Sequence, residues 1–458
     1  MSKTILAIDI GSITTKAVIA EIDEFNDIKV LGHGFEKSQG VKKGIITNID
    51  LASKTIKKAV SDARRIAGNN IHTAIVSISS AYTKSLNSIG IVNIPQKDIT
   101  LKEINRVMET ALYNADIPKD YDVLHVLPYN FKVDDQSNIE DPFNMNATRM
   151  EVEAHIIVAQ KSSLSNLKKA IISAGLDVES IVLDSYASAI ATMTNDERKL
   201  GVAVLDLGGQ TSSITILKGN SVRYNNFLPV GSDHITNDIS IALHTPLDIA
   251  EKVKIQYGDL IEVSEDELEL PIIGDNINTN IIPLKVVHDV MIARVEELLL
   301  ILSKYLDKSD LRDRIGSGII LTGGLTKLRH IREFAQLIFP GISVRVAQPK
   351  ELNGLFDGLK DPSNSTVIGL LLYKSGLNTQ YEIDNNKNLL HNKEEQQQEG
   401  LGNIKLHKPN NELSRSGEIH SPIIDNSSGG IQLDGLPNIN EEESSFGNKL
   451  KNWIKQLF

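Results

Sequence analysis

Two stretches of the sequence combine aspartate, glycine and threonine in an order that suits phosphate chemistry. The stretch "LAIDIGSITTKAVIA" at residues 6–20 aligns without a gap with "AVLDLGGQTSSITIL" at residues 203–217. The alignment pairs Asp9 with Asp206, Gly11 with Gly208, Thr14 with Thr211 and Ile19 with Ile216. Each copy has the pattern of an apolar strand, a turn and a second strand rich in β-branched residues. The repeat therefore predicts two similar halves in one chain.

The turn in each copy has the features of a phosphate site that uses a metal ion. Its glycine lets the backbone approach a ligand closely, and successive backbone N–H groups can form an anion-binding concavity. Asp9 and Asp206 would repel phosphate directly, but each can hold a hydrated magnesium ion that bridges the β and γ phosphates. Lys16, on the second strand of the first copy, is positioned to reach phosphate oxygens. A single Asp-x-Gly is usually only a turn, so this interpretation depends on the two gapless copies.

A third glycine signal lies in "SGIILTGGLTKLRHIREFA" at residues 317–335. An apolar strand ends there in two glycines, directly before an amphipathic helix. This arrangement permits close approach of a flat or anionic group, although such a pair is often only a tight connection. The cofactor-binding candidates from the three motifs are Asp9, Gly11, Ser12, Thr14, Thr15, Lys16, Asp206, Gly208, Gly209, Gln210, Thr211, Gly323 and Gly324.

Composition excludes several classes of function. The formal net charge of −11 argues against nucleic-acid binding, which normally needs a basic face. The chain has no cysteine, which excludes disulfides, thiolate zinc sites and a cysteine nucleophile and fits a reducing, cytoplasmic compartment. The N-terminus lacks the pattern of a signal peptide, and no apolar run approaches the roughly 20 residues that span a bilayer.

Strand and helix patterns alternate through both halves, which predicts an α/β fold. Between Tyr82 and Lys161 the pattern is that of a small inserted α/β subdomain, and a second insertion follows Thr236. Residues after about 380 are polar and glycine-bearing, which predicts a flexible linker. The expected segments are a first core at 1–82 and 161–198 with an insert at 83–160, a second core at 199–235 and 307–364 with an insert at 236–306, a return to the first core at 365–380, a linker at 381–444 and a terminal helix at 445–458.

The stretch "FGNKLKNWIKQLF" at residues 446–458 has the pattern of an amphipathic helix. At about 100° per residue, its apolar residues share one face and its lysines lie opposite. Because about 60 residues of linker precede it, packing on the protein's own core would require a long loop closure. We therefore expect a helix that lies in the plane of an anionic membrane surface. The membrane-binding candidates are Phe446, Lys449, Leu450, Lys451, Trp453, Ile454, Lys455, Leu457 and Phe458.

Together these segments resemble the actin, Hsp70 and sugar-kinase ATPase superfamily, and within it the FtsA family of bacterial cell-division proteins. The resemblance runs from residue 4 to about 375 and returns at the extreme C-terminus. It is carried by "SQGVKKGIITNID" at 38–50, by "VLHVLPYNFKVD" and "RMEVEAHIIVA" in the first insert, by "DIAEKVKIQYG", and by "SGIILTGGLTKL". It implies an actin-like ATPase fold, with two similar α/β halves around a nucleotide cleft, and it implies ATP and Mg²⁺ as cofactors.

The resemblance also assigns roles to residues outside the glycine motifs. It implies that Gly231 and Asp233 lie near the phosphates or ribose, and that Glu251 and Lys254 flank the purine and ribose. Asp184 stands where chaperone-like members carry a catalytic glutamate, so it is a candidate for orienting an attacking water. The alternative for Asp184 is a polar residue that caps a helix N-terminus.

Gln210 departs from the pattern, because chaperone-like members carry a third glycine at its position. This lowers the case for an efficient ATPase and leaves nucleotide binding in place. Any hydrolysis would rest on Asp184, and secondarily on Asp206, through phosphate clamping and water positioning. We expect at most a weak ATPase and primarily a nucleotide-binding scaffold.

The resemblance implies a division protein that polymerises on the cytoplasmic face of the inner membrane and tethers FtsZ filaments, the Z-ring, to it. Expected partners are the FtsZ C-terminal peptide, further copies of the chain, anionic lipids and later division proteins that it recruits. Arg294, in the helix expected at 284–306, is a candidate cation for the acidic FtsZ peptide; the alternative is a solvated residue on a mostly buried helix. Two rival functions are a sugar or acid kinase of the superfamily and a scaffold resembling the pilus-assembly protein PilM.

Overall fold

The computed structural model describes residues 2–81, 83–219, 221–274 and 278–391 of the chain. Residues Met1–Glu394 form one compact unit. The predicted membrane helix at 446–458 and most of the predicted linker lie outside the described residues. Within the described ranges, no helix combines the length and the apolar character needed to cross a membrane.

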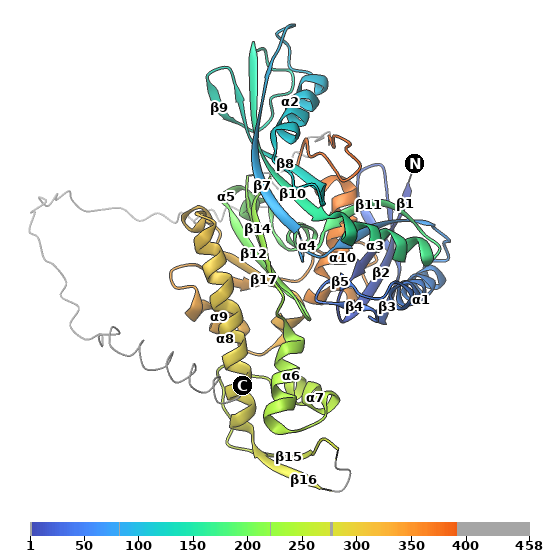
Figure 1. Cartoon of the computed structure of the whole chain (residues 1–458), viewed down its shortest axis with the longest axis vertical. Coiled ribbons are helices and arrows are strands. Elements are labelled where there is room, and N and C mark those ends of the chain that lie inside the picture. Colours follow the sequence, from blue (N-terminus) through green and yellow to red (C-terminus); the bar gives the residue numbers. More distant parts are fainter. Residues whose placement is uncertain (1, 82, 220, 275–277, 392–458) are drawn as a thin grey trace, which may run out of the picture. The chain divides into compact units, whose positions relative to one another are not determined.

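The first half of the chain builds a five-stranded sheet in the order β11-β6-β1-β2-β3 (Figure 1). The central strand β1 (Lys3–Ile10) pairs antiparallel with β2 (Thr14–Ile22) and parallel with β6 (Thr73–Ile78). Outside them, β3 (Ile28–Lys37) pairs antiparallel with β2, and β11 (Asp177–Leu183) pairs parallel with β6. The last six residues of β1 are buried, as expected for a central strand that is covered on both faces.

The second half repeats this topology in the order β14-β13-β12-β17-β18. Its central strand β12 (Val202–Leu207) pairs antiparallel with β13 (Ser212–Lys218) and parallel with β17 (Ile319–Thr322). Outside them, β14 (Ser221–Leu228) pairs antiparallel with β13, and β18 (Val344–Val346) pairs parallel with β17. The two similar halves predicted from the sequence repeat are therefore confirmed.

Helices pack against both sheets. They are α1 (Ile49–Ala67), α3 (Lys161–Ser173), α4 (Asp184–Thr192), α5 (Asn195–Leu200), α9 (Ile331–Ile338) and α10 (Ser365–Leu372). Short helical turns are η1 (Arg312–Arg314), η2 (Gly324–Lys327), η3 (Asp357–Leu359), η4 (Pro362–Asn364) and the π-helical η5 (Tyr373–Leu377). The sequence marks the ends of α1 clearly, because Asn48 caps its first turn and Gly68 ends it in a left-handed conformation.

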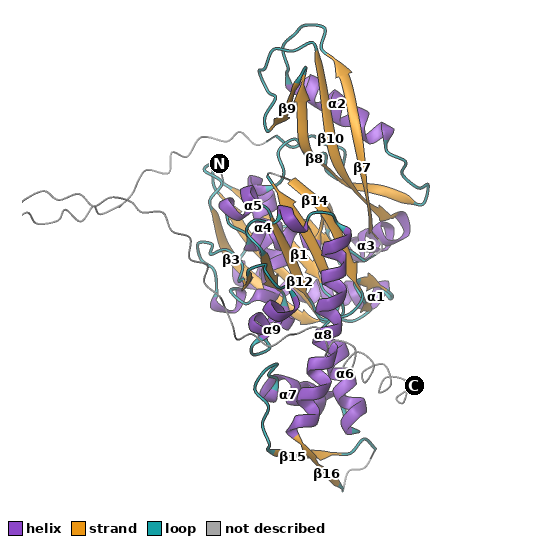
Figure 2. Ribbon diagram, turned by 90° about the vertical axis from the view of Figure 1, so that its left-hand side faces the viewer, coloured by secondary structure: helices purple, strands orange, loops and turns teal. Residues whose placement is uncertain are grey.

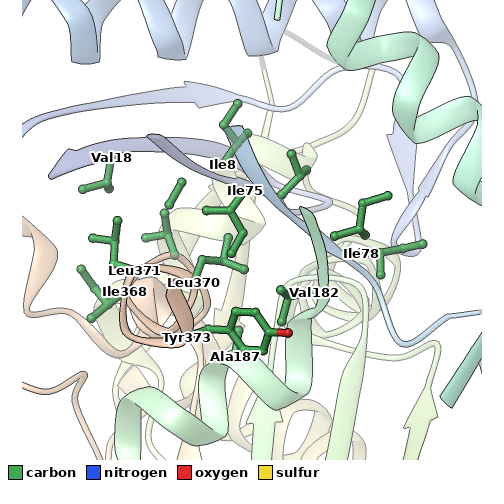
Figure 3. Packing of buried hydrophobic residues seen from close by; sticks show 14 of the residues in the cluster. Ile8, Val18, Ile75, Ile78, Val182, Ala187, Ile368, Leu370, Leu371 and Tyr373 are labelled. Carbon is green, nitrogen blue, oxygen red and sulfur yellow. The ribbon is translucent and has the colours of Figure 1, made fainter. Parts of the chain in front are cut away.

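Helix α4 begins at Asp184, and its close packing against α10 positions that residue. Figure 3 shows Ile368, Leu370 and Leu371 of α10 packed among buried residues of the first sheet. Gly369 faces α4 so closely that a Cβ there would lie 1.8 Å from the carbonyl oxygen of Ala187. A residue larger than glycine would therefore separate the two helices.

The segment between β6 and α3 forms its own sheet and core. Its strands are β7 (Thr83–Asn93), β8 (Tyr121–Val133), β9 (Gln136–Ile139) and β10 (Arg149–Gln160), in the order β7-β10-β8-β9. Helix α2 (Leu101–Asn114) lies along this sheet (Figure 2) and contributes Ile104, Val107 and Met108 to a separate buried cluster. This layer occupies the region in which the sequence predicts an inserted subdomain.

A second, mostly helical segment follows β14. It comprises α6 (Ser232–Leu243), α7 (Leu247–Tyr257), β15 (Glu267–Pro271), β16 (Thr279–Pro283) and α8 (Leu284–Lys308). Helices α6 and α8 pack on each other, and β15 pairs with β16 as a hairpin. In the first half, a smaller hairpin joins β4 (Val41–Lys42) to β5 (Ile45–Ile46).

The folded part of the chain continues past the predicted start of the linker at 381. Tyr381 and Ile383 are fully or almost fully buried, and Ile383 forms a β-bridge with Val126 of β8. Residues 378–391, which we call the strap, thus pack against the first insert. The sequence does not show this clearly, because the strap is mostly polar and its large apolar residues are limited to Tyr381, Ile383 and the pair Leu389–Leu390.

Candidate functional site

A cleft of about 480 Å³ lies between the two sheets and receives residues from both halves of the repeat. Most of the predicted cofactor-binding residues line it. These are Asp9, Gly11, Ser12, Thr14, Lys16, Asp206, Gly208, Gly209, Thr211, Glu251, Lys254, Gly323 and Gly324, together with Asp184. The structure does not place Thr15, Gln210, Gly231 or Asp233 on the cleft wall.

The turns of the two repeats have the same geometry. Asp9 pairs with Lys16 across β1 and β2, and Asp206 pairs with Ser213 across β12 and β13. A Cβ at Gly11 would lie 2.8 Å from the carbonyl oxygen of the threonine three residues later, and the same distance applies at Gly208. Such contacts are too short for any side chain, so each turn requires its glycine and leaves backbone exposed to the cleft.

Helix α6 begins directly on the second turn. The backbone N–H groups of Ser232 and Asp233 donate to the carbonyl oxygens of Gly208 and Gly209, at 3.0 and 2.8 Å. A Cβ at Gly231 would lie 2.5 Å from the Gly208 oxygen. Gly231 and Asp233 therefore hold the second turn in shape, while Ser232 lines the cleft.

Gly323 closes the opposite wall of the cleft at the end of β17. Its φ of 91° lies in the left-handed region, and a Cβ would come 2.5 Å from Oδ1 of Asp206. Both facts require glycine at this position. The third glycine signal thus meets the second aspartate motif, because β17 and β12 are parallel neighbours.

Asp9 and Lys16 form a buried pair at the base of the first turn. The Lys16 ammonium lies 3.7 Å from Oδ2 of Asp9 and also donates to the Ser363 carbonyl. The Ser77 hydroxyl donates to Oδ1 of Asp9 at 2.9 Å. This network holds the lysine and the carboxylate at the cleft in fixed positions.

Asp184 and Asp206 add two further carboxyl groups to the cleft. Loss of hydration raises the pKa of Asp184 to about 7, against hydrogen bonds from Ser80 that lower it, and the nearby charge of Asp206 raises it further. Loss of hydration also raises the pKa of Asp206 to about 6, with the charge of Asp9 acting in the same direction. The negative charge of Asp9 thus disfavours the ionised forms of Asp184 and Asp206, and a bound cation would relieve that repulsion.

The structure has a feature that fits each interpretation of Asp184, as a polar residue at a helix N-terminus and as a carboxyl group beside the site. Its Oδ1 accepts hydrogen bonds from the Ser80 hydroxyl at 2.6 Å and from the Ser185 backbone N–H at 2.6 Å, at the start of α4. At the same time the side chain lines the cleft. The hydrogen bonds fix the carboxyl group at the end of a helix while leaving it beside the site.

A direct metal site is not formed by these groups. Within the ranges that the structure describes, no three His, Cys, Asp or Glu side chains have an arrangement that could hold a metal ion. The charge distribution nevertheless suits a hydrated cation, because Asp184 and Asp206, whose pKa values are raised, line a cleft of about 480 Å³ beside Asp9. That arrangement fits a cation held through water by Asp9 and Asp206.

The far side of the cleft is formed by α7 and the loop after it. Lys254 is buried, and its ammonium donates to Oε2 of Glu251 at 2.6 Å, to the Thr236 hydroxyl at 2.8 Å and to the Ser232 carbonyl at 3.2 Å. Lys254 therefore ties α7 to α6. Glu251 is the more exposed member of the ion pair.

Sequence reasoning missed about half of the cleft wall. The missed residues are Ile10, Ile13, Gly44, Ser77, Ser79, Ser213, Ser232, Ile255, Gly258, Leu325, Lys327, Leu328, Arg329, Ser363 and Thr366. Ser213 could have been found, because it aligns with Lys16 in the repeat. Ser363 and Thr366 had no local signal, since they reach the site only through the packing of α10 against the first sheet.

Two predicted residues have roles away from the cleft. The Thr15 side chain points to the neighbouring strand, where its hydroxyl lies 2.8 Å from that of Ser38. The Arg294 guanidinium is held by Asp238, with Nε 2.6 Å from Oδ2, and by Glu297. Hydrogen bonding to Asp238 raises the pKa of Arg294. Arg294 thus links α8 to α6, and its predicted role in partner binding stays a prediction.

Two sequence profiles match the chain. The profile described as "Cell division protein FtsA" matches residues 203–369, and the one described as "SHS2 domain inserted in FTSA" matches residues 80–158. The second match covers the sheet of β7, β8, β9 and β10. The inserted layer therefore has the sequence character of an SHS2 domain.

Solved structures support the fold. The structure titled "PilM-PilN type IV pilus biogenesis complex" matches with a TM-score of 0.58 at 17% identity, covering 81% of this chain and 98% of that one. MreB5 of Spiroplasma citri matches with a TM-score of 0.50 at 12% identity, covering 81% and 96%. At such low identity these matches speak only to the fold, and they confirm the predicted actin-like architecture.

Curated proteins give the family. "Cell division protein FtsA" of Helicobacter pylori (strain ATCC 700392 / 26695) is 38% identical over 412 residues, which is 83% of each chain. The protein of that name from Pseudomonas aeruginosa is 34% identical over 374 residues, or 81% of this chain and 89% of the other. The one from Bacillus subtilis is 33% identical over 373 residues. With matches of this extent, the chain belongs to the FtsA family of cell division proteins.

Proposed function

We propose that the chain is an ATP-binding, actin-like division protein that polymerises on the cytoplasmic face of the inner membrane. At the division site it tethers FtsZ filaments to the membrane and recruits later division proteins. The observation that carries the proposal is the cleft, in which two copies of one Asp-x-Gly turn face each other in a chain of the FtsA family.

Nucleotide binding is supported by the chemistry of the cleft wall. The turns at Gly11 and Gly208 leave backbone accessible at both sides, and Lys16 supplies a fixed positive charge. Two structures of MreB5 from Spiroplasma citri, which share this fold, are described as bound to ADP and to AMPPNP. We assign the nucleoside to the side of Glu251 and Lys254 and the phosphates to the two turns.

We also assign a magnesium ion to the phosphate side of the cleft. Asp9 and Asp206 would hold a Mg²⁺ ion through water, and the ion would supply positive charge that offsets the charge of the phosphates. Ionised Asp206 would then be favoured, because the cation would offset the loss of hydration and the charge of Asp9, which both raise its pKa. Asp184 keeps its side chain beside this position and is our candidate for orienting a water molecule.

Membrane attachment rests on the sequence of residues 446–458. Each large apolar side chain contributes roughly 1.5–3 kcal/mol at full burial, and each lysine near an anionic surface contributes about 1 kcal/mol. Ordering the helix costs roughly 1–2 kcal/mol per residue. For one tail the gain and the ordering cost are of similar size, so a filament carrying many tails would bind far more firmly than one copy.

Calorimetry with Mg-ATP tests the nucleotide site. We expect wild-type protein to bind Mg-ATP and Asp206→Ala to bind it at least about 10-fold more weakly, because the aspartate holds the hydrated cation. Gly323→Asp should also weaken binding, since any Cβ there meets Asp206. Circular dichroism of each variant controls for folding. Unchanged affinity in both folded variants would remove the proposed site.

The rival functions differ in their tests. A sugar or acid kinase would transfer phosphate from ATP to a small-molecule acceptor, whereas the scaffold proposed here needs no acceptor. A PilM-like role is less well supported, because the pilus complex shares 17% identity with this chain and the Helicobacter pylori division protein shares 38%.

A further inference from the structure

The hairpin β4–β5 ends in a two-residue turn formed by Lys43 and Gly44. Lys42 pairs with Ile45 across the hairpin, and both turn residues have positive φ angles, of 48° and 78°. This is the geometry of a type I′ turn, in which neither turn residue contributes its N–H to the strand ladder. The tip of the hairpin therefore presents two backbone donors that need acceptors elsewhere.

Each of these donors binds a side chain from a different repeat turn. The Gly44 N–H donates to the Ser12 hydroxyl, in the β1–β2 turn, at 2.8 Å. The Lys43 N–H donates to Oε1 of Gln210, in the β12–β13 turn, also at 2.8 Å. The hairpin tip belongs to the first half of the chain, so the contact with Gln210 joins the two halves.

The amide nitrogen of Gln210 sets the orientation of the amide group, whose oxygen binds Lys43. Its Nε2 donates to Oδ2 of Asp233 at 2.9 Å. Asp233 is itself held, because its backbone N–H donates to the Gly209 carbonyl at 2.8 Å. Since a carboxylate accepts and a backbone N–H donates, the amide satisfies both neighbours in only one orientation.

This contact lies beside the part of the cleft wall that the repeat turns form. Ser12, Gly44 and Gly209 all line the cleft directly next to it. Gly209 is also approached closely by Ile13, whose Cδ1 would lie 2.4 Å from a Cβ at the glycine. The two turns are thus held together at the place where we assign the phosphates.

We propose that Gln210 is a latch that joins the two halves across the phosphate side of the cleft and slows nucleotide release. The proposal rests on the nucleotide binding proposed above. Gln210 is a positioning residue, since it acts through the hairpin tip and does not line the cleft. Where chaperone-like members of the superfamily carry a glycine, the longer side chain of Gln210 forms a hydrogen bond that glycine cannot form.

Release of a fluorescent ATP analogue, measured by stopped flow with Mg²⁺ present, tests the latch. A single hydrogen bond contributes about 0.5–1.5 kcal/mol, so Gln210→Ala and Gln210→Gly should release the analogue about 3- to 10-fold faster. The association rate should stay within about 2-fold, because the cleft wall is unchanged. A release rate equal to that of the wild type in both variants would overturn the proposal.

Lys43→Ala is the matched control, because it removes the side chain and keeps the backbone N–H that binds Gln210. It should release the analogue at the wild-type rate. If it accelerates release as much as Gln210→Ala, the lysine charge carries the effect and the latch is wrong.

Hydrogen exchange separates the latch from the nucleotide proposal. In nucleotide-free protein, the Lys43 amide should exchange faster in Gln210→Ala than in wild type, since its acceptor is lost. Equal exchange would show that the bond does not persist in solution, which contradicts the latch. If the wild-type protein bound no ATP, the proposed function and the claim about nucleotide release would both be refuted. If the Lys43 amide were still protected from exchange in that protein, the hydrogen bond to Gln210 would remain established.

Discussion

At the scale of single residues, the cleft is defined by carboxyl groups that oppose one another's ionisation. Asp184 and Asp206 both have raised pKa values because the surrounding protein removes water and Asp9 lies near them. Such clusters are typical of sites that bind cations or orient water. The free-energy cost of placing Asp9, Asp184 and Asp206 together should therefore lower the stability of the protein without its ligands.

The pH dependence of stability tests this cost. An aspartate whose pKa is about 7 in the folded protein and near 4 unfolded keeps its proton longer when folded. Folding is then favoured at low pH, and this contribution falls as the pH rises from about 4 to about 7. We expect Asp184→Asn to remove this slope and to stabilise the ligand-free protein at pH 8 by on the order of 2 kcal/mol.

Thermal unfolding of wild type and Asp184→Asn at several pH values between 5 and 8 gives the comparison. Groups that do not interact with Asp184 affect both proteins alike, so the difference between the two curves reports Asp184 together with its coupling to Asp206. Parallel curves across the whole range would show that the carboxyl group has no raised pKa. Added Mg²⁺ should reduce the difference, because a nearby cation stabilises the ionised aspartate.

At the scale of elements, a buried polar network joins the strap to the first insert and to the helix that carries Asp184. Glu382 of the strap is fully buried and accepts a hydrogen bond from Nδ1 of His125 at 2.6 Å. The other ring nitrogen of His125 accepts from the Leu183 backbone N–H, which fixes the tautomer. Tyr373 and Tyr186 donate to the same carboxylate, at 2.8 and 3.2 Å.

Removal of this carboxylate should destabilise the whole folded unit. We expect Glu382→Ala to lower the free energy of unfolding by about 3–5 kcal/mol, because it leaves three buried donors without their acceptor. Urea denaturation measures the change. Glu351→Ala, at an exposed position, should stay within about 0.5 kcal/mol of wild type. A loss at Glu382 no larger than that of the control would show that the strap is not part of the cooperative fold.

The elements also show what the sequence can and cannot predict. The central hairpin of each sheet and the two turns at the cleft followed from a gapless repeat, because a strand, a turn and a strand are encoded locally. The strap did not, since its anchor His125 lies 257 residues away from Glu382. Gln210 was visible only as a departure from glycine, and its contact with Lys43 spans 167 residues. Side chains whose partners are set by tertiary packing leave no periodic pattern to read.

At the scale of the whole molecule, we propose that a nucleotide-binding body is attached to the membrane by a weak anchor. Family membership is shown by matches over more than four fifths of the chain, and the fold by solved actin-like neighbours. The predicted anchor at 446–458 lies outside the described residues and remains a proposal. Its proposed weakness makes attachment depend on assembly, and nucleotide would act by favouring the assembling conformation.

Co-sedimentation with anionic liposomes tests the proposal that the chain tethers FtsZ to the membrane through residues 446–458. Full-length protein, Mg-ATP and FtsZ are mixed with liposomes, and the FtsZ in the pellet is compared with that of a chain lacking residues 446–458. We predict that the full-length protein carries FtsZ into the liposome pellet and that the shortened chain leaves it in the supernatant. Equal amounts of FtsZ in the two liposome pellets would contradict the account.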